Sequence, residues 1–307
     1  MTHSYVREKN LLKNLKTEAP YITTADRLAT FKRFAYDKRF DATCTSEKLA
    51  HAGFNSSANP DLPFSAKCPF CMVELDFDQF DDAWEKHKSA KPDCDFVKFG
   101  AFNENQLTIR QIAILAMRCA TVKMFEEMLE IITKLKNCDN MPDNKMIRYE
   151  ISKKIAVFRN ASKMLTNEHR LATFSNWIYD KKKRAACTSR KVAKSGFVST
   201  ASKRLGRSAE CPFCLKNFVF GEADDPWTEH QKYSPDCDFV KLGKLDEKQW
   251  TEEEALMLCA RIVVLKKYKK GNWLIDELER ENKTKELLDI KKMMVKPKIA
   301  MERRRII

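Results

Sequence analysis

Three cysteines and one histidine recur at the same spacing in two parts of the 307-residue chain, 143 residues apart. The first set comprises Cys68, Cys71, His87 and Cys94, and the second comprises Cys211, Cys214, His230 and Cys237. Three thiolate sulfurs and one imidazole nitrogen complete a tetrahedral ligand set for Zn²⁺, which leaves no coordination position for a substrate. The pattern therefore predicts two structural zinc ions and argues against a metalloenzyme. Ordinary buried cysteines are the alternative, but they would not explain a spacing that repeats at all four positions.

The composition is that of a folded protein in a reducing compartment. Hydrophobic residues make up 43% of the chain and charged residues 33%, which provides enough apolar material for two compact domains. No apolar run reaches the length of a membrane span, and the first residues lack the apolar core of a secretion signal. The 11 cysteines are an odd number and six belong to the metal sets, so we expect the nucleus and cytoplasm rather than a disulfide-bonded secreted protein.

The chain carries a formal net charge of +14, and many of its cations cluster in short runs. The runs are Lys181–Arg184, the lysines from Lys291 to Lys298, and Arg303–Arg305. Such runs serve nuclear import or nonspecific phosphate contact, and they also occur on ordinary solvated surfaces. Few aromatic residues accompany them, so a surface that stacks on nucleobases is not indicated. Direct nucleic-acid binding stays open on charge alone but is not required.

The repetition extends well beyond the metal ligands. Residues 27–100 align with residues 170–243 without a gap, and about half of the positions are identical. A period of 143 residues is far longer than that of a solenoid repeat, so the sequence indicates a duplicated domain. A domain of this size has a thin core, and we expect zinc binding to supply much of its folding free energy.

Each copy is expected to fold as a small α+β unit. The apolar spacing from Arg27 to Phe34 predicts a short helix, and Thr45 is suited to cap a second helix that Gly53 ends. The Cys68–Cys71 segment predicts a metal-binding turn between strands, and the stretch from Asp82 to Lys88 predicts a helix that carries the zinc histidine. The counterparts of the cap and the stop in the second copy are Thr188 and Gly196.

Long helices are expected after both copies. Apolar residues at three- and four-residue steps from Ile109 to Leu135 predict the first, and Thr251–Glu254 forms a capping box that opens the second. Cys138–Asn144 is the clearest break, and Lys145 to Glu168 is expected to be helical. The predicted organisation is an N-terminal extension at 1–20, a first domain at 21–103, a helical linker at 104–160, a second domain at 161–246 and a helical basic C-terminal extension at 247–307.

The motif Cys-x2-Cys, then Asp-Asp-x-Trp-x2-His and x6-Cys, preceded by an Arg-x3-Phe element and a Gly-Phe pair, resembles the baculoviral IAP repeat (BIR). The resemblance covers both aligned blocks and is closest in Asp224–His230. Within that family the chain is most similar to survivin-type members, and its two repeats without another module resemble nematode-type two-repeat proteins. The resemblance implies two α+β domains, each a short three-stranded sheet with helices around one zinc. It also implies recognition of peptide N-termini rather than catalysis.

Survivin-type members act in chromosome segregation and cytokinesis through the chromosomal passenger complex, and the resemblance implies such a role here. The partners would be proteins or peptide N-termini, such as the histone H3 tail or passenger-complex subunits. The protein would meet them at the chromosomes or the spindle during mitosis, and no membrane partner is expected. The alternative is an apoptosis regulator that binds or inhibits caspases or their antagonists, with caspase-pathway proteins as partners. A ubiquitin-ligase RING is not expected, because only Cys259 follows Cys237 among the cysteines and no histidine follows His230.

A free peptide N-terminus is a cation, so its receptor requires carboxylates beside a pocket for the first side chain. In the family an acid lies six residues before the zinc histidine, a second contact lies one residue before it, and an aromatic wall lies three residues after it. In the second copy the resemblance assigns the acid, the second contact and the wall to Asp224, Glu229 and Tyr233, and Phe220 stands where the family has a groove tryptophan. The corresponding residues of the first copy are Asp81, Lys86, Ala90 and Phe77. We call each set a candidate amine-binding site.

The second copy retains the parts of an amine-binding site, whereas the first has lost two of them. Lys86 places an ammonium where Glu229 places a carboxylate, and it would repel a cationic N-terminus by about 1 kcal/mol or more. Ala90 leaves the wall open where Tyr233 closes it. We therefore predict peptide binding by the second copy, and a solvated acidic helix end with a surface tyrosine is the alternative.

Overall fold

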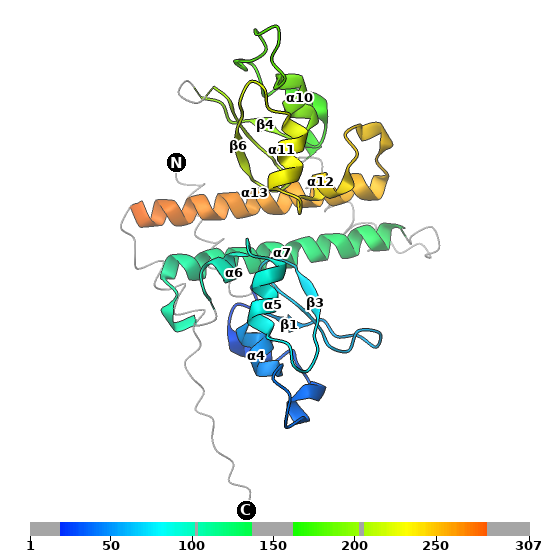
Figure 1. Cartoon of the computed structure of the whole chain (residues 1–307), viewed down its shortest axis with the longest axis vertical. Helices are drawn as coiled ribbons and strands as arrows, with labels where there is room; N and C mark the ends of the chain where they lie inside the picture. Colours follow the sequence, from blue (N-terminus) through cyan, green and yellow to red (C-terminus); the bar gives the residue numbers. More distant parts are fainter. Residues whose placement is uncertain (1–18, 102–103, 137–161, 203–205, 281–307) are drawn as a thin grey trace, which may run out of the picture. The chain divides into compact units, whose positions relative to one another are not determined.

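The computed structural model describes residues 19–101, 104–136, 162–202 and 206–280 (Figure 1). The chain divides into two compact units, one formed by residues 1–123 together with 268–307, and the other by residues 124–267. Each unit contains one of the two repeats, and each repeat has the predicted α+β fold, a three-stranded sheet with short helices. Within the described residues, no helix combines the length and the apolar character that crossing a membrane requires.

The first repeat is built on a small antiparallel sheet. Its elements in chain order are α3 (Thr24–Leu28), η1 (Ala35–Lys38), α4 (Ser46–His51), β1 (Asn55–Ser56), β2 (Ser65–Lys67), β3 (Glu74–Asp76), α5 (Ala83–Ala90) and α6 (Asp95–Lys98). The strand order is β1-β2-β3, and Ala66 of β2 lies opposite Ser56 on one side and Leu75 on the other. The turn between β2 and β3 and the two helices that follow β3 therefore carry the predicted zinc ligands.

The second repeat has the same order of α-helices and strands, but its 3₁₀ helix precedes the first α-helix instead of following it. Its elements are η4 (Ser162–Met164), α9 (Asn167–Leu171), α10 (Ser189–Lys194), β4 (Val198–Ser199), β5 (Ser208–Glu210), β6 (Asn217–Val219), α11 (Pro226–Tyr233) and α12 (Asp238–Leu242). The strand order is β4-β5-β6, again antiparallel. Its core consists largely of buried aromatic rings: Phe174, Trp177, Tyr179, Phe197, Phe213, Phe220 and Phe239.

A long helix follows each repeat, as the sequence predicts, and a 3₁₀ turn that the sequence did not predict precedes each long helix. They are η2 (Glu104–Gln106) and α7 (Ile109–Lys136) after the first repeat, and η5 (Glu247–Gln249) and α13 (Glu252–Arg280) after the second. The capping box of α13 is confirmed: the Thr251 N–H donates to Glu254 Oε2 at 2.8 Å, and the Glu254 N–H donates to Thr251 Oγ1 at 3.2 Å. Thr108 and Gln111 exchange the same pair of bonds at the start of α7, at 2.9 and 3.2 Å. Both long helices therefore begin at reciprocal caps, which satisfy N–H groups that the helix itself leaves unpaired.

The cap and stop predicted for the second helix of each repeat are confirmed in the first repeat and half confirmed in the second. Thr45 Oγ1 accepts the Lys48 N–H at 3.4 Å, whereas Thr188 occupies the N-cap of α10 without a side-chain hydrogen bond. Gly53 and Gly196 follow α4 and α10 with φ of +92° and +94°. A Cβ at either glycine would lie 2.7 Å from a phenylalanine ring, so both backbone conformation and space require glycine.

The helix predicted from Arg27 to Phe34 is wrong in its boundaries. The observed helix α3 begins three residues earlier, because Thr23 Oγ1 accepts the Asp26 N–H at 3.1 Å and caps it there. It ends at Leu28, and Arg33 adopts a left-handed φ of +57° that a right-handed helix cannot contain. Apolar spacing alone therefore placed a helix where the backbone turns.

The helix predicted from Lys145 to Glu168 lies largely outside the described residues. The part of this prediction that falls on described residues is wrong, because the chain forms two separate elements there. η4 ends at Met164, and α9 begins at Asn167, where the Thr166 side chain caps the new helix. The break predicted at Cys138–Asn144 and the basic runs at 291–298 and 303–305 also lie outside the described residues.

A fully buried arginine anchors the start of each repeat. In the first repeat Arg27 donates to the carbonyl oxygen of Ala50 at 2.9 Å and to Glu104 Oε1 at 2.8 Å, and its guanidinium lies 5.1 Å from the centroid of the Phe96 ring. Arg170 makes the equivalent bonds in the second repeat, to the Ala193 carbonyl at 2.9 Å and to Glu247 at 3.2 Å. Each arginine therefore joins the first helix of its repeat to the 3₁₀ turn that precedes the long helix. Burial acts to lower the pKa of both groups, and the neighbouring glutamates oppose that shift.

Candidate metal centres and the adjoining acidic surface

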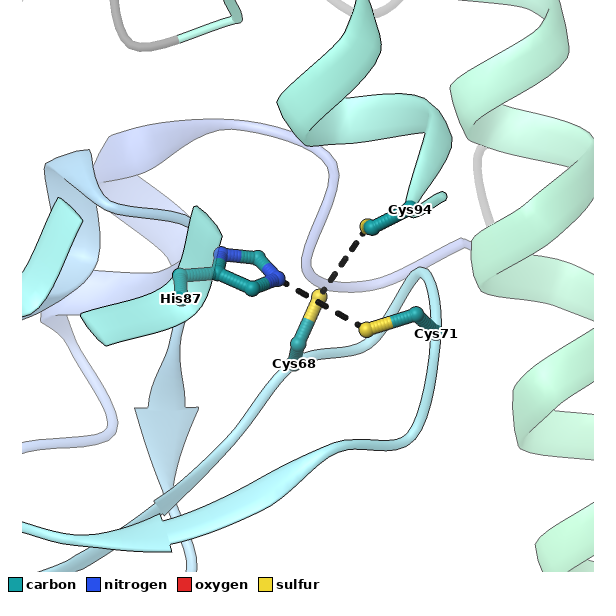
Figure 2. A group of neighbouring side chains, drawn as sticks. All are labelled: Cys68, Cys71, His87 and Cys94. Atoms are coloured by element: carbon teal, nitrogen blue, oxygen red, sulfur yellow. Dashed lines mark hydrogen bonds between the residues drawn. The ribbon is translucent and has the colours of Figure 1, made fainter. Parts of the chain in front are cut away.

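The first ligand set is assembled from one turn and two helices. Cys68 follows β2, Cys71 lies in the turn before β3, His87 lies on α5, and Cys94 is the N-cap of α6. The turn closes through a 2.9 Å hydrogen bond from the Met72 N–H to the Cys68 carbonyl, with Met72 at a left-handed φ of +67°. Figure 2 shows that the three sulfurs and the imidazole are directed toward a common centre.

The ligand atoms lie at the separations that one zinc ion requires. In the first set Cys68 Sγ is 4.0 Å from Cys94 Sγ, and Cys71 Sγ is 3.6 Å from His87 Nε2. In the second set both distances are 3.8 Å, between Cys211 Sγ and Cys237 Sγ and between Cys214 Sγ and His230 Nε2. The four ligand atoms of each set lie within 4.8 Å of one another. Because tetrahedral zinc with Zn–S bonds of about 2.3 Å has sulfur–sulfur edges of about 3.8 Å, both sets fit Zn²⁺.

Each zinc histidine is oriented by a hydrogen bond to its other ring nitrogen. His87 Nδ1 lies 2.8 Å from the Ala52 carbonyl oxygen, and His230 Nδ1 lies 2.8 Å from the Ser195 carbonyl oxygen. A carbonyl only accepts, so Nδ1 carries the proton and Nε2 is left to bind the metal. Both imidazoles are fully buried. Fixed tautomers and burial are properties of a closed structural site.

The protonation chemistry of the thiols agrees with a cation site. Burial raises the pKa of the Cys68 and Cys211 thiols well above the usual range, and the neighbouring thiols of each set add to the rise. Crowded thiolates repel one another, and a dry interior disfavours their charge. A divalent cation reverses both effects, because it binds the thiolates and displaces their protons. The two sets therefore fit two structural zinc ions in chemistry as well as in geometry.

The acidic residues of the second candidate amine-binding site lie in the loop before α11 and in the first turn of that helix. Asp224 is half-buried, and its Oδ2 accepts the Gly221 N–H at 2.6 Å, which fixes the carboxylate just beyond the end of the strand. Glu229 is half-buried on α11, and Lys232 attracts it electrostatically. Among the described residues, no side chain forms a hydrogen bond or an ion pair with the Glu229 carboxylate. Tyr233 is 48% exposed at the last turn of α11.

Phe220, which the resemblance assigns to the groove, is only 1% exposed and belongs to the core. Its ring lies edge-on to Phe197 at 5.3 Å and stacks on Phe218 at 5.6 Å. Phe218, in the middle of β6, is half-buried, and its ring centroid lies 6.3 Å from that of Tyr233. The aromatic ring beside Tyr233 is therefore that of Phe218, a residue that the family motif does not indicate. Its position two residues before Phe220, on the same strand face, was the available signal.

In the first candidate amine-binding site the acid is bonded to a lysine of the same repeat. Lys86 Nζ donates to Asp81 Oδ2 at 2.6 Å and to the Asp76 carbonyl oxygen at 2.9 Å. Burial acts to raise the pKa of Asp81, but the hydrogen bonds from Lys86 and from the Asp78 N–H outweigh it and lower the pKa. Ala90, the counterpart of Tyr233, is exposed. The sequence placed an ammonium at this position, but it did not show that the ammonium is bonded to both the acid and the strand.

The basic run Lys181–Arg184 is exposed. Lys182 forms an ion pair with Glu222, and its Nζ lies 5.5 Å from the centroid of the Tyr179 ring. The described part of the basic sequence is therefore a solvated and partly paired surface, which is one of the two interpretations that the sequence left open.

Comparison with known proteins agrees with this geometry. The family model for the BIR, described as the Inhibitor of Apoptosis domain, matches residues 27–98 and 170–241. Baculoviral IAP repeat-containing protein bir-2 of Caenorhabditis elegans is 55% identical over 305 residues, 99% of each chain. Chromosomal passenger complex protein bir-1 of the same species is 42% identical over 107 residues, 34% of this chain and 66% of that protein. Baculoviral IAP repeat-containing protein 5.2-A of Xenopus laevis is 32% identical over 149 residues, 48% of this chain and 84% of that protein. With both repeats matched and a relative aligned over almost its whole length, the chain belongs to the BIR family of inhibitor-of-apoptosis proteins.

Proposed function

We propose that this chain is a non-enzymatic recognition protein whose second repeat binds the N-termini of partner proteins. The observation that carries the proposal is that the carboxylates of Asp224 and Glu229 are both half-buried, while Tyr233, four residues after Glu229 on α11, is exposed. An α-ammonium is attracted by two partly desolvated carboxylates more strongly than by exposed ones, because less water screens the interaction. The tyrosine offers an apolar wall to the first side chain of the peptide.

The strand next to these carboxylates supports binding of an extended peptide. β6 is last in the order β4-β5-β6, so within the described residues its outer edge pairs with no further strand. Such an edge presents backbone N–H and C=O groups to an added strand. Val219 is 55% exposed on this strand, and the Asp224 carboxylate is fixed two residues beyond it by the Gly221 N–H. A peptide that pairs with β6 would place one end beside the two acids.

Zinc, when bound, contributes folding free energy and no reactivity, since its four ligands leave no open position. Within the second repeat His230 of α11 and Cys211 of the turn after β5 belong to one ligand set. The position of Glu229 on α11 relative to the sheet therefore depends on the metal. A closed metal centre without an open position supports recognition rather than catalysis as the role of this repeat.

A role in cell division is supported by the relatives. One of them is named as a chromosomal passenger complex protein, and others are the baculoviral IAP repeat-containing proteins 5.1 and 5.2. We therefore place the partners of this chain among proteins that act in chromosome segregation and cytokinesis. The corresponding compartments are the nucleus and cytoplasm, with the chromosomes or the spindle during mitosis.

The test is binding of the full-length protein to alanine-first peptide pools that differ only in N-terminal acetylation. Acetylation removes the charge of the amine, so acetylated peptides should bind at least tenfold more weakly, which corresponds to about 1.4 kcal/mol. Glu229→Gln and Asp224→Asn should each reduce this preference for the free amine. Glu252→Gln removes one exposed carboxylate from the first turn of α13 and should leave the preference intact. Equal affinity for the free and acetylated pools would refute the proposed function.

A further inference from the structure

The amine-binding site of the first repeat already holds an ammonium. Lys86 Nζ lies 2.6 Å from Asp81 Oδ2, 2.9 Å from the Asp76 carbonyl oxygen of β3, and 5.2 Å from the centroid of the Phe77 ring. A carboxylate, a strand carbonyl and an aromatic face are the groups that stabilise a primary ammonium. The lysine side chain therefore satisfies the contacts that a peptide α-ammonium would need at this place.

The ion pair is partly shielded from water. The Lys86 side chain is 36% exposed and the Asp81 side chain 26%. Both groups have their positions fixed by further bonds, because Asp81 also accepts the Asp78 N–H at 2.7 Å and Lys86 bonds the carbonyl of β3. The ammonium is thus held between α5 and the strand rather than extended into solvent.

The second repeat has the opposite charge at the equivalent position. Glu229 replaces Lys86, Asp224 replaces Asp81, and Val219 replaces Asp76 as the residue of the strand. The Asp224 carboxylate accepts the Gly221 N–H, and among the described residues no cation lies within ion-pair distance of Asp224 or Glu229. In the second repeat Lys232 attracts Glu229, but its Nζ lies over the Tyr233 ring, 4.8 Å from the centroid, and not on a carboxylate. One repeat therefore holds an ammonium bonded to the acid of its amine-binding site, and the other does not.

We propose that Lys86 acts as a built-in occupant that closes the amine-binding site of the first repeat to the N-termini of other proteins. The proposal rests on the proposed function in so far as the second repeat is taken as the open form of the same site. A tethered ammonium competes at an effective concentration on the order of millimolar or above, which few partners reach in solution. A peptide amine that entered beside it would also meet like-charge repulsion. Lys86 thereby limits a chain with two repeats to one bound N-terminus.

The experiment exchanges the charges of the two sites in the full-length protein. Glu229→Lys should close the second site and abolish the protein's preference for the free alanine-first pool over the acetylated one. Adding Lys86→Glu and Ala90→Tyr to that variant should restore the free-amine preference, now at the first repeat. The affinity of this triple variant for the free-amine pool should be at least tenfold above that of the Glu229→Lys single variant. In the otherwise unchanged protein, Lys86→Glu with Ala90→Tyr should raise the stoichiometry from one peptide per chain to two.

Lys88→Glu is the matched control. It makes the same charge change on α5, at a lysine that pairs with the exposed Glu85 rather than with Asp81. It should open no site. Zinc content by native mass spectrometry verifies that each variant is folded.

The outcomes separate this proposal from the function on which it rests. The role of Lys86 is overturned if the unchanged protein prefers free amines but the charge-exchanged variant, with both zinc ions still bound, gains no binding of the free-amine pool. A gain after the exchange without any preference in the unchanged protein supports Lys86 and overturns the role of the second repeat. Absence of binding in every variant overturns both.

Discussion

The two repeats share a scaffold and differ in the site that the scaffold presents. In both, a Cys3His set joins the turn after the second strand to two short helices, and a buried arginine fixes the first helix. On the surface beside the metal, the first repeat pairs Lys86 with Asp81, whereas among the described residues of the second neither Asp224 nor Glu229 forms an ion pair, although Lys232 attracts Glu229. Under the proposed function, a few side chains on one helix decide binding while the fold stays the same.

This separation of scaffold from site has a physical reason. The metal ligands, the arginine and the buried rings are constrained by packing and by hydrogen bonds that leave no alternative partner, so both repeats retain them. Lys86 and Ala90 of the first repeat lie partly or fully exposed on α5, where a substitution costs little stability. The comparison therefore predicts equal responses of the two repeats to changes in the scaffold and unequal responses to changes at the site.

The largest effect is expected when a zinc ligand is removed. Cys68→Ser should unfold the first repeat and Cys211→Ser the second, because zinc binding to such sites contributes about 10–16 kcal/mol. Native mass spectrometry should show one zinc ion in each variant instead of two, and hydrogen exchange should show lost protection in the mutated repeat. Cys44→Ala, at a buried cysteine outside the ligand set, should keep both zinc ions. Retained protection in a repeat that has lost its zinc would contradict the shared scaffold.

The next effect is loss of the buried arginine. Arg27→Met and Arg170→Met should each lower the free energy of unfolding by about 3–5 kcal/mol, because buried carbonyls and a glutamate lose a charged donor. Denaturant midpoints measured with saturating zinc, with hydrogen exchange to assign the affected repeat, test this. Lys88→Met on the exposed face of α5 should stay within about 0.5 kcal/mol of the unchanged protein. A clear difference between the two arginine variants would show that the scaffolds are not equivalent.

Much of the scaffold could be predicted from sequence because its requirements are local. The spacing of the zinc ligands, the glycine at position 53 and the capping box at Thr251 each follow from residue type over a few positions, and all are confirmed. The helix expected from Arg27 failed because apolar spacing carries no information on the left-handed φ of Arg33. Thr188 has the residue type of a cap, yet its side chain makes no capping bond.

The site was harder to predict, because its contacts join residues of different elements. Sequence placed an ammonium at Lys86, but the bond to the Asp76 carbonyl depends on how α5 lies against β3. Phe220 occupies the position expected for a groove residue, yet packing buries it and brings Phe218 next to Tyr233. Strand alternation predicts which residues share a face, but not which of them the neighbouring helix covers.

A smaller effect should distinguish the two sites at their aromatic wall. Tyr233→Ala should weaken binding of free N-termini about tenfold, or about 1.4 kcal/mol, because the peptide loses an apolar contact that is 48% exposed in the free protein. Ala90→Tyr should have no effect on binding while Lys86 is present, since the ammonium and not the missing ring closes the first site. Titration of the full-length protein with the alanine-first pool measures both. Binding gained by Ala90→Tyr alone would remove Lys86 from the explanation.

The smallest effect concerns the caps of α4 and α10, a place where the scaffolds themselves differ. Thr45→Ala removes a side-chain hydrogen bond to the Lys48 N–H and should cost about 0.5–1 kcal/mol, at the low end for a cap because the bond is long at 3.4 Å. Thr188→Ala removes no such bond and should change stability by less, so the two denaturant midpoints should shift unequally. Equal shifts would mean that the Thr188 hydroxyl forms the capping bond in solution, and the scaffolds would then be alike at this position too.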